Sequence, residues 1–218
     1  DGQGHTLSFT KTLSVEALAP FGNASGATIK NLKVQGALSS DKQYIAGIVG
    51  KVGSTGITIE NCWSDLTITY TGTSDACCAG ILGRSNGTTT IKNCLVTGAI
   101  KATNESDAAK AISGVVGYNP GSQTLTLTNV LFAGTLDNVG TKTYYIVRGD
   151  GTQTATNAYY LNSVTSVQKK VSESQATEQL LNSGKLAYDF SQADNTNNTL
   201  FWEQDKLNTS IVDKYPTL

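Results

Sequence analysis

The sequence predicts an all-β fold, a right-handed single-stranded parallel β-helix of about five coils with three strands per coil. The main observation is an Asn that recurs between apolar residues at spacings of 30, 32, 36 and 28 residues: Asn31, Asn61, Asn93, Asn129 and Asn157. Apolar residues alternate on both sides of each Asn, and pairs of glycines follow at a fixed station. A period of this length is typical of repeats that bury their apolar faces by stacking.

The first strand of each predicted coil precedes the Asn. The position two residues before it is apolar in every repeat: Ile29, Ile59, Ile91, Leu127 and Ala155. The residue directly before this apolar position is Thr in four repeats: Thr28, Thr58, Thr90 and Thr126. This period-2 alternation with β-branched residues predicts a half-buried strand.

The second strand follows the Asn. Its apolar column begins at Leu32, Cys62, Cys94, Val130 and Ala158 and continues seven residues past the Asn at Leu38, Ile68, Ile100 and Leu136. Asn itself suits the corner between the two strands because its side chain tolerates left-handed backbone angles and bonds to neighbouring polar groups. We therefore expect the five Asn side chains to form a ladder.

Paired glycines mark the third strand, at Gly47 and Gly50, at Gly80 and Gly83, and at Gly114 and Gly117. A glycine at the same station in successive coils predicts either a bend with positive φ or a crowded backbone. Parallel connections between strands of one sheet are right-handed in nearly all proteins, which sets the expected hand of the spiral.

Two motifs carry a resemblance to a known family. Gly80-Ile81-Leu82-Gly83 precedes Ile91-Lys92-Asn93-Cys94, and the opening residues 1–7 read DGQGHTL. This pattern resembles the GLUG-type repeats of bacterial surface proteins, adhesins and some secreted peptidases, and the opening is similar to a "DGNGHTI" step, from which Gln3 and Leu7 depart. The resemblance implies a β-helical, non-catalytic module of a bacterial surface protein.

The repeat pattern ends near Thr165, so we expect repeats over residues 1–164 and a C-terminal cap over residues 165–218. Thr177, Leu180 and Leu181 predict a capped helix that stops or kinks at Gly184. An aromatic tail with Phe201 and Trp202 follows, and we expect it to cover the last coil. The ending also resembles the tail of GLUG-type proteins.

Composition narrows the class of protein. Sixteen Lys and Arg stand against 17 Asp and Glu, which gives no electrostatic footprint for nucleic acid or an anionic membrane. No run of about 18 apolar residues predicts a membrane span. The Gly, Thr, Ser and Asn content favours an extracellular or cell-surface protein, which we expect to be a monomer. The chain starts at Asp1 without Met, so we expect a signal and further protein upstream.

Aromatic side chains give the main binding hypothesis. Trp63 and Tyr159 share, with Leu95 and Leu131, the column after the inward apolar position, where alternation predicts an outward direction. A row of exposed rings can stack on sugar rings, and Tyr44 and Tyr160 supply further rings. The candidate ligand-binding residues are therefore Trp63, Tyr44, Tyr159 and Tyr160. The alternative is that the Asn corner resets the alternation or that the C-terminal segment buries this face.

Charged residues support weaker hypotheses. Asp41, Asp75 and Asp107 precede the third strand and are candidate Ca²⁺ ligands, although polar loops explain them more simply. A polysaccharide lyase or hydrolase would use Asp65, Asp75, Asp107 and Arg84. Arg148-Gly149-Asp150 is the tripeptide of integrin ligands, but the repeat already requires its glycine.

Cysteine offers no clear chemistry. Cys62 and Cys94 occupy one column and lie close enough for a disulfide, but a stack of small buried side chains explains them without a bond. We expect no cofactor. The leading hypothesis is a non-catalytic module that binds a glycan or protein on a host or bacterial surface, and the alternatives are the polysaccharide-cleaving enzyme and a structural spacer.

Overall fold

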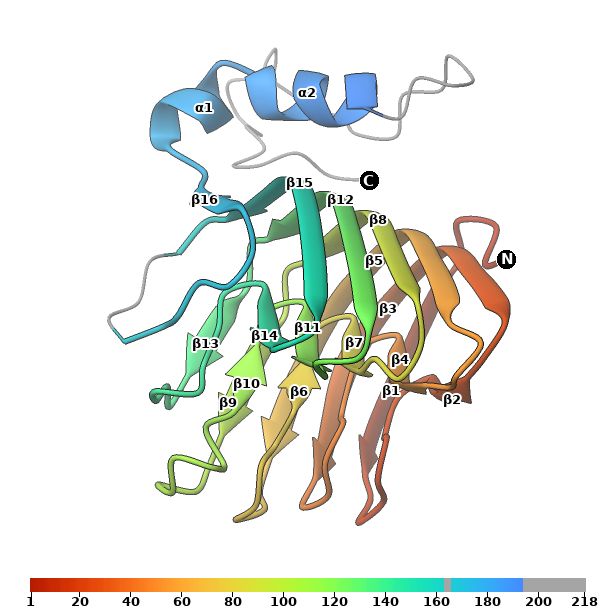
Figure 1. Ribbon diagram of the computed structural model, residues 1–218, viewed down its shortest axis with the longest axis vertical. Coiled ribbons are helices and arrows are strands. Elements are labelled where there is room, and N and C mark those ends of the chain that lie inside the picture. Colours follow the sequence, from red (N-terminus) through yellow and green to blue (C-terminus); the bar gives the residue numbers. More distant parts are fainter. Residues whose placement is uncertain (163–165, 194–218) are drawn as a thin grey trace.

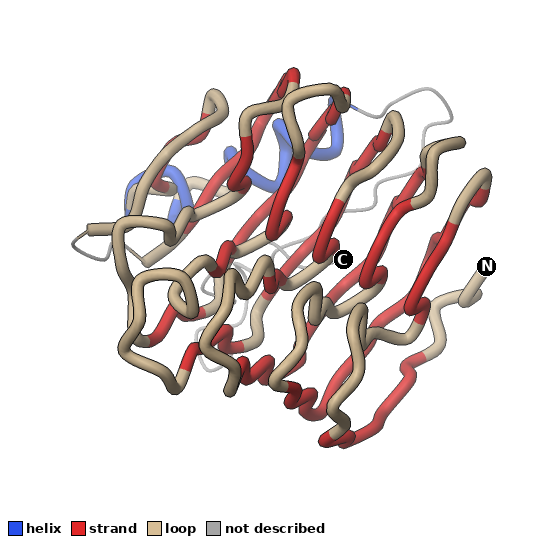
Figure 2. The backbone as a smooth tube through the Cα atoms, turned by 60° about the horizontal axis from the view of Figure 1, so that its bottom comes forward, coloured by secondary structure: helices blue, strands red, loops and turns tan. Residues whose placement is uncertain are grey.

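The structure is a parallel β-helix of about five coils, as the repeat predicts (Figure 1). The computed structural model describes residues 1–162 and 166–193. Successive coils lie directly over one another along one axis, and the stack is visible in the backbone trace (Figure 2). Every pairing between named strands is parallel, which confirms the predicted spiral and excludes hairpins between these strands.

A nine-stranded sheet forms two of the three faces. Its strands are β1 (Thr6–Thr12), β3 (Ala27–Ser40), β5 (Ile57–Tyr70), β8 (Thr89–Val96), β9 (Ala99–Ala102), β12 (Thr124–Phe132), β13 (Thr135–Asp137), β15 (Thr152–Tyr160) and β16 (Glu173–Gln175). The register pairs Ile29 with Ile59, and Ile59 with Ile91. Each apolar column of the repeat is thus one column of the sheet.

The third face carries the shorter strands. A five-stranded sheet contains β2 (Phe21–Ala24), β4 (Val49–Val52), β7 (Leu82–Arg84), β11 (Val116–Asn119) and β14 (Val147–Gly149). A two-stranded sheet contains β6 (Cys78–Ala79) and β10 (Ile112–Ser113). The buried aliphatic residues of all faces meet inside the coils in one core cluster.

The Asn corner bends the chain without ending the strand. All five Asn residues have φ between 51° and 55°. Each side chain donates from Nδ2 to Oδ1 of the Asn one coil earlier, at 2.9–3.1 Å, and Asn31 donates to Asp1 Oδ1 at 3.0 Å. The predicted ladder is confirmed. The first two strands of a coil therefore run together as one long strand in β3 and β5.

The repeated glycines are explained by crowding. Gly47, Gly80 and Gly114 do not have positive φ, but a Cβ on Gly80 would lie 2.6 Å from the carbonyl oxygen of Gly114 in the next coil. A Cβ on Gly83 would lie 2.8 Å from the Cα of Tyr44, in a loop outside the sheet. Of the two reasons expected for a fixed glycine, close approach of backbones applies here.

The C-terminal segment contains the expected capped helix and is preceded by one further strand. Strand β16 pairs with Ala158–Tyr160 of β15, and Gln168 bridges to Tyr144, so the segment up to Gln175 adds part of a sixth coil beyond the boundary predicted at residue 164. Helix α1 (Glu178–Asn182) begins after the predicted N-cap Thr177, and α2 (Lys185–Ala193) follows Gly184, whose φ is +72°.

The helices lie along the side of the β-helix, not across its end. Figure 1 shows α2 lying above the upper ends of β15 and β12 in this view. Leu186 and Phe190 are buried there against the nine-stranded sheet. The expected aromatic tail with Phe201 and Trp202 lies outside the described residues. Among the residues that are described, no helix has the length and apolar character of a membrane span.

Candidate functional site

The outward column after the Asn corner is the region where side chains leave the repeat pattern. The sheet register places Lys33, Trp63, Leu95, Leu131 and Tyr159 side by side in this column. Leu95 and Leu131 belong to a cluster separate from the interior core, which confirms that the column points out of the coil. We call these five residues the outer column.

Half of the outer column is covered. Leu95 and Leu131 are both 0% exposed, because Leu186 and Phe190 of α2 pack on them. The ring of Tyr159 lies 5.8 Å from the ring of Phe190 and is half-buried. The expected continuous row of exposed residues is therefore wrong for the β8, β12 and β15 part of the face. The alternative of burial by the C-terminal segment is confirmed for that part.

The helix is also bonded to the Asn ladder. Asn129 Nδ2 donates to the Phe190 carbonyl oxygen at 2.7 Å as well as to Asn93 Oδ1 at 2.9 Å. Asn93 and Asn129 are fully buried, whereas Asn31 and Asn61 are half-buried. The covered half of the face thus holds its helix through apolar packing and through a buried hydrogen bond.

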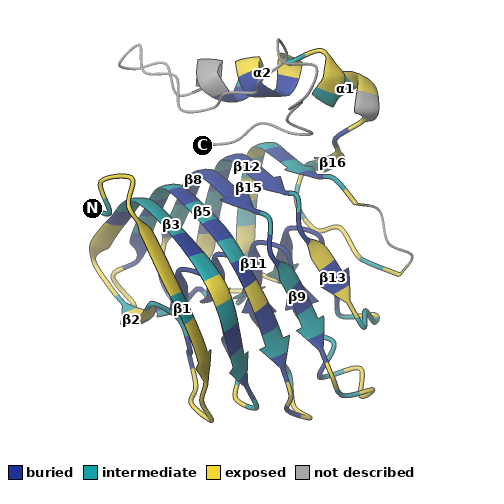
Figure 3. Cartoon of the chain, turned by 180° about the vertical axis from the view of Figure 1, so that it is seen from behind, coloured by how far each residue is buried: buried dark blue, intermediate teal, exposed yellow. Residues whose placement is uncertain are grey.

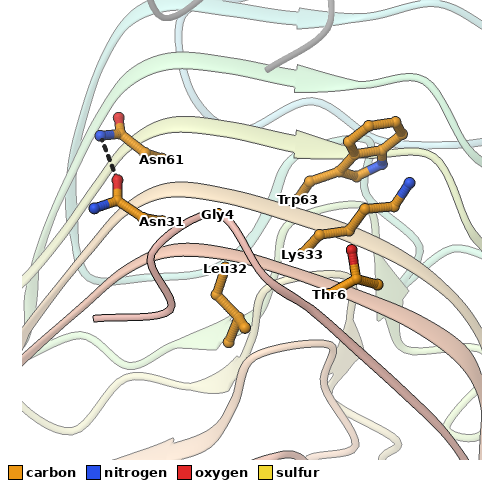
Figure 4. A pocket seen from close by; sticks show the side chains of 7 residues that line it. All are labelled: Gly4, Thr6, Asn31, Leu32, Lys33, Asn61 and Trp63. Atoms are coloured by element: carbon orange, nitrogen blue, oxygen red, sulfur yellow. Dashed lines mark hydrogen bonds between the residues drawn. The ribbon is translucent and has the colours of Figure 1, made fainter.

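The other end of the outer column is open and hollowed. A hollow of about 270 Å³ lies beside Trp63, and its lining residues are Gly4, Thr6, Asn31, Leu32, Lys33, Asn61 and Trp63. Figure 4 shows Lys33 and Trp63 extending to the same side, and Leu32 pointing away from them. Figure 3 shows that β1, at this end of the stack, is largely exposed. We call this feature the Trp63 hollow.

The indole of Trp63 is held in place by polar contacts. Its Nε1 donates to Thr97 Oγ1 at 2.8 Å, and that hydroxyl donates to Asp65 Oδ1 at 2.8 Å. The Lys33 ammonium lies 3.6 Å from the ring centroid, within the range of a cation–π contact. The ring is therefore pre-oriented, with the Lys33 ammonium over the ring and the amide side chains of Asn31 and Asn61 lining the same hollow.

The other predicted ligand-binding tyrosines do not join Trp63. Tyr160 is 2% exposed and stacks on Tyr145 at 3.8 Å between centroids. Tyr44 is 6% exposed, and its hydroxyl accepts from Arg84 Nη1 at 2.8 Å beside the five-stranded sheet. The prediction of a joint aromatic site is wrong, because alternation along one strand carries no information on loops or on covering segments.

The three candidate Ca²⁺ ligands have separate partners. Asp41 pairs with Lys42, and Asp75 pairs with Arg148 at 2.8 Å. Asp107 accepts from the Thr141 hydroxyl at 2.7 Å, and this hydrogen bond is the main cause of the lowered pKa of its carboxyl. In residues 1–162 and 166–193, no cluster of three His, Cys, Asp or Glu side chains is suited to a metal ion.

The residues suggested for a polysaccharide-cleaving enzyme are dispersed as well. Asp65 accepts from Thr97 on the nine-stranded sheet, whereas Arg84 bonds to Tyr44 and Asn86 at the five-stranded sheet. Neither contact includes Asp75 or Asp107. These side chains therefore make no shared contact from which an acid and a base could act on one bond.

The Arg148-Gly149-Asp150 tripeptide is built into the coil. The Arg148 side chain is 13% exposed, and its guanidinium donates to Asp75 Oδ2 at 2.8 Å and to Cys77 Sγ at 3.3 Å. Gly149 has φ of +135°, and a Cβ there would meet the Asn119 carbonyl oxygen. Asp150 pairs with Lys170 at 3.5 Å. The repeat explains the glycine, and the two charged residues have different partners.

The four cysteines are buried thiols. Cys62 and Cys94 are neighbours in the register and remain unbonded, as expected. Burial raises the pKa of Cys94 well above its ordinary value and raises the pKa of Cys77 to about 12. The Cys77 and Cys94 thiols therefore stay protonated near neutral pH, which gives no support for thiolate chemistry at these two residues.

Sequence reasoning missed a second surface feature. Lys51, Arg84 and Arg148 lie on the outer side of the five-stranded sheet with Tyr44 and Tyr118 between them. We call these five residues the basic column. A signal was present, since Lys51, Arg84 and Tyr118 each follow the second glycine of their repeat directly and Arg148 precedes the equivalent Gly149.

No family model, curated protein or solved structure matches this chain.

Proposed function

We propose that this chain is a non-catalytic module of a bacterial cell-surface or secreted protein and that it contacts carbohydrate through the Trp63 hollow. The observation that carries the proposal is that Leu95 and Leu131 of the outer column are covered by the chain's own C-terminal segment, whereas Trp63, beside Leu95, lines an open hollow. The resemblance to GLUG-type surface repeats supports the location outside the cell and the absence of catalysis.

The chemistry of the hollow suits a sugar. An indole face is apolar and electron-rich, so it accepts the C–H groups of a pyranose ring. Lys33, on a flexible stem, can leave the ring and donate to sugar hydroxyls, while Asn31 and Asn61 provide amide groups at the rim. The volume of about 270 Å³ is near the lower end of small-molecule sites, which favours one sugar unit over a long oligosaccharide.

The test is a glycan array followed by calorimetry on the best glycan. We expect binding by the native chain, loss of it in Trp63→Ala, and partial recovery in Trp63→Phe, which keeps an aromatic face. Tyr188→Ala is the matched control, because Tyr188 is an aromatic residue 62% exposed on α2. Absence of any glycan bound by the native chain, or equal binding by Trp63→Ala, would contradict the proposal.

A structural spacer is the second candidate function, and the Asn ladder favours it. A hydrogen-bonded row through all coils stiffens the stack along its axis, as a spacer requires. Deletion of one whole coil, compared with Trp63→Ala, separates the two functions in a cell-attachment assay. For the alternative of a lyase or hydrolase, incubation with uronic-acid polymers and Ca²⁺ would reveal new chain ends.

A further inference from the structure

The basic column forms one continuous stack across four coils. The Tyr44 ring lies between Lys51 Nζ, at 5.6 Å, and the Arg84 guanidinium, at 5.5 Å. The Tyr118 ring lies between the guanidinium groups of Arg84, at 5.5 Å, and Arg148, at 5.0 Å. Cations and rings thus alternate along the axis. The three cations and Tyr118 lie on neighbouring strands, which are about 4.8 Å apart, and Tyr44 reaches the stack from a loop.

The local backbone explains why the stack is fixed. Gly83 has no side chain, so the Tyr44 backbone packs directly on it, and Gly117 accepts the Cys77 backbone in the same way. Tyr44 is thereby held beside Arg84, whose Nε donates to Asn86 Oδ1 at 2.8 Å and whose Nη1 donates to the Tyr44 hydroxyl at 2.8 Å. The Arg84 guanidinium is oriented before any ligand arrives.

Positive charge is in excess on this surface. Arg148 pairs with Asp75 at 2.8 Å, but the partners of Arg84 are a neutral amide and a hydroxyl. In the part of the chain that the structure describes, Lys51 has no carboxylate within ion-pair distance. The Cys77 thiol beside Arg148 is protonated, because burial raises its pKa to about 12. Three cations against one carboxylate leave two unbalanced positive charges.

The surface also has a recess. A hollow of about 190 Å³ adjoins the N-terminal end of the basic column, and its lining includes Lys51, Asn86, Asn23 and Ser25. All four side chains carry hydrogen-bond donors, and Asn86 is the partner of Arg84. An anionic group seated here would meet a cation and several neutral donors together.

We propose that the basic column binds an acidic polysaccharide, with its carboxylate or sulfate groups on Lys51, Arg84 and Arg148 and its sugar rings on Tyr118. Guanidinium groups bind carboxylate and sulfate oxygens in pairs of hydrogen bonds, and the half-buried Tyr118 ring between Arg84 and Arg148 suits the apolar face of a sugar. A single row of cations on a chain of net charge −1 gives little long-range attraction for nucleic acid. This surface lies on another sheet from the Trp63 hollow and does not depend on it.

The first experiment measures binding of polygalacturonate and dextran sulfate, with uncharged dextran as reference, by calorimetry at two salt concentrations. We expect the charged polymers to bind with an affinity that falls as the salt concentration rises, and we expect dextran not to bind. Lys51→Gln with Arg84→Gln should weaken binding about tenfold for each cation removed. Lys11→Gln with Lys101→Gln is the charge-matched control on the nine-stranded sheet and should bind normally.

The second experiment uses a variant expected to gain affinity, which misfolding cannot imitate. Asp75→Asn removes the one carboxylate paired with Arg148 and should tighten binding of polygalacturonate several-fold. Equal binding by Asp75→Asn and the native chain, or equal loss in the Lys11 and Lys101 control, would overturn the proposal. Single-stranded DNA that binds as tightly as the acidic polysaccharides would overturn the choice of ligand class.

The two proposals fail separately. Trp63→Ala should leave binding of acidic polymers unchanged, and the Lys51 and Arg84 double variant should leave the Trp63-dependent glycan unchanged. Loss of acidic-polymer binding in Trp63→Ala would assign both activities to the Trp63 hollow and overturn the role of the basic column.

Discussion

The C-terminal and N-terminal halves of the β-helix share one backbone but present different outer faces. In β8 and β12 the outer column is aliphatic, fully buried and covered by α2. In β3 and β5 the same register positions hold Lys33 and Trp63, which line an open hollow. The Asn corner that sets the direction of these side chains is the same in both halves.

The difference teaches that the repeat determines direction, whereas a segment outside the repeat determines exposure. Leu131 is buried because Leu186 and Phe190, far along the chain, fold back onto it. Trp63 is only partly buried against the same cluster and also lines the open hollow. Substitutions at equivalent positions should therefore have large effects on stability in the covered half and effects on binding in the open half.

The largest expected effect is at Asn129. Asn129→Ala places an alanine at a φ of 55°, in the left-handed region. It also removes the side-chain hydrogen bonds to Asn93, Asn157 and the Phe190 carbonyl oxygen. Left-handed strain and unpaired buried groups should together cost about 3–5 kcal/mol in the free energy of unfolding. Denaturant unfolding of the native chain and of the variant measures this difference in free energy.

The matched variant is Asn31→Ala at the open end, where the side chain is half-buried and water can replace the lost bonds. We expect it to cost about 1–2 kcal/mol. Equal losses in Asn31→Ala and Asn129→Ala would show that α2 adds nothing at Asn129 and would contradict the comparison.

The next effect is at Leu131. Leu131→Ala removes buried contacts with α2 and should destabilise the chain by about 2–4 kcal/mol. Limited proteolysis should then cut within residues 178–190 sooner than in the native chain, since the helix loses its apolar seat. An unchanged proteolysis rate together with an unchanged unfolding midpoint would show that α2 does not pack on Leu131. Leu7→Ala is the control, because Leu7 is exposed.

A third prediction concerns pH at the covered end. Glu173 in β16 is half-buried, and burial raises the pKa of its carboxyl to about 7. Between about pH 4.5 and pH 7 the folded chain then binds more protons than the unfolded chain, so the stability from this group falls as pH rises and is constant above that range. The loss is at most about 3 kcal/mol, at about 1.4 kcal/mol per pKa unit.

The measurement is the free energy of unfolding against pH for the native chain and for Glu173→Gln. The difference between the two curves should fall across this window. A difference that rises with pH would mean that the carboxylate, and not the acid, is the form that the last coil stabilises.

The smallest effect is at the open end. The cation–π contact of Lys33 with Trp63 should contribute about 0.5–1 kcal/mol, as is usual for exposed pairs. A double-mutant cycle with Lys33→Gln and Trp63→Leu, each of which removes the contact, measures this coupling by denaturant unfolding. A coupling of several kcal/mol would indicate a buried, structural pair and would weaken the case for Trp63 as a binding residue.

The repeat itself could be predicted from the sequence because stacking imposes it residue by residue. The Asn ladder, the inward columns and the glycine stations each recur at a fixed offset, and a wrong residue at any of them would meet its own equivalent in the next coil. The unbonded state of Cys62 and Cys94 follows from the same reasoning, since both fill an inward column.

The sites could not be predicted as well because they depend on contacts between the repeat and non-repeating segments. Tyr44 lies in a loop whose fold over Gly83 has no periodic signal, and Tyr160 stacks on Tyr145 inside the last coil. The position of α2 along the side, in place of the end, depends on Phe190 meeting Leu131 and Asn129. The basic column could have been predicted only by aligning the residues next to the second glycine of each repeat.

Hydroxyl-radical footprinting tests the comparison between the two halves most directly, because it reports the accessibility of each side chain. We predict that Trp63 is labelled in the free chain, that a bound glycan protects it, and that Leu95 and Leu131 stay unlabelled until the chain unfolds. Labelling of Leu95 and Leu131 as fast as that of exposed Leu7 would show that the C-terminal segment does not cover the face and would contradict the account.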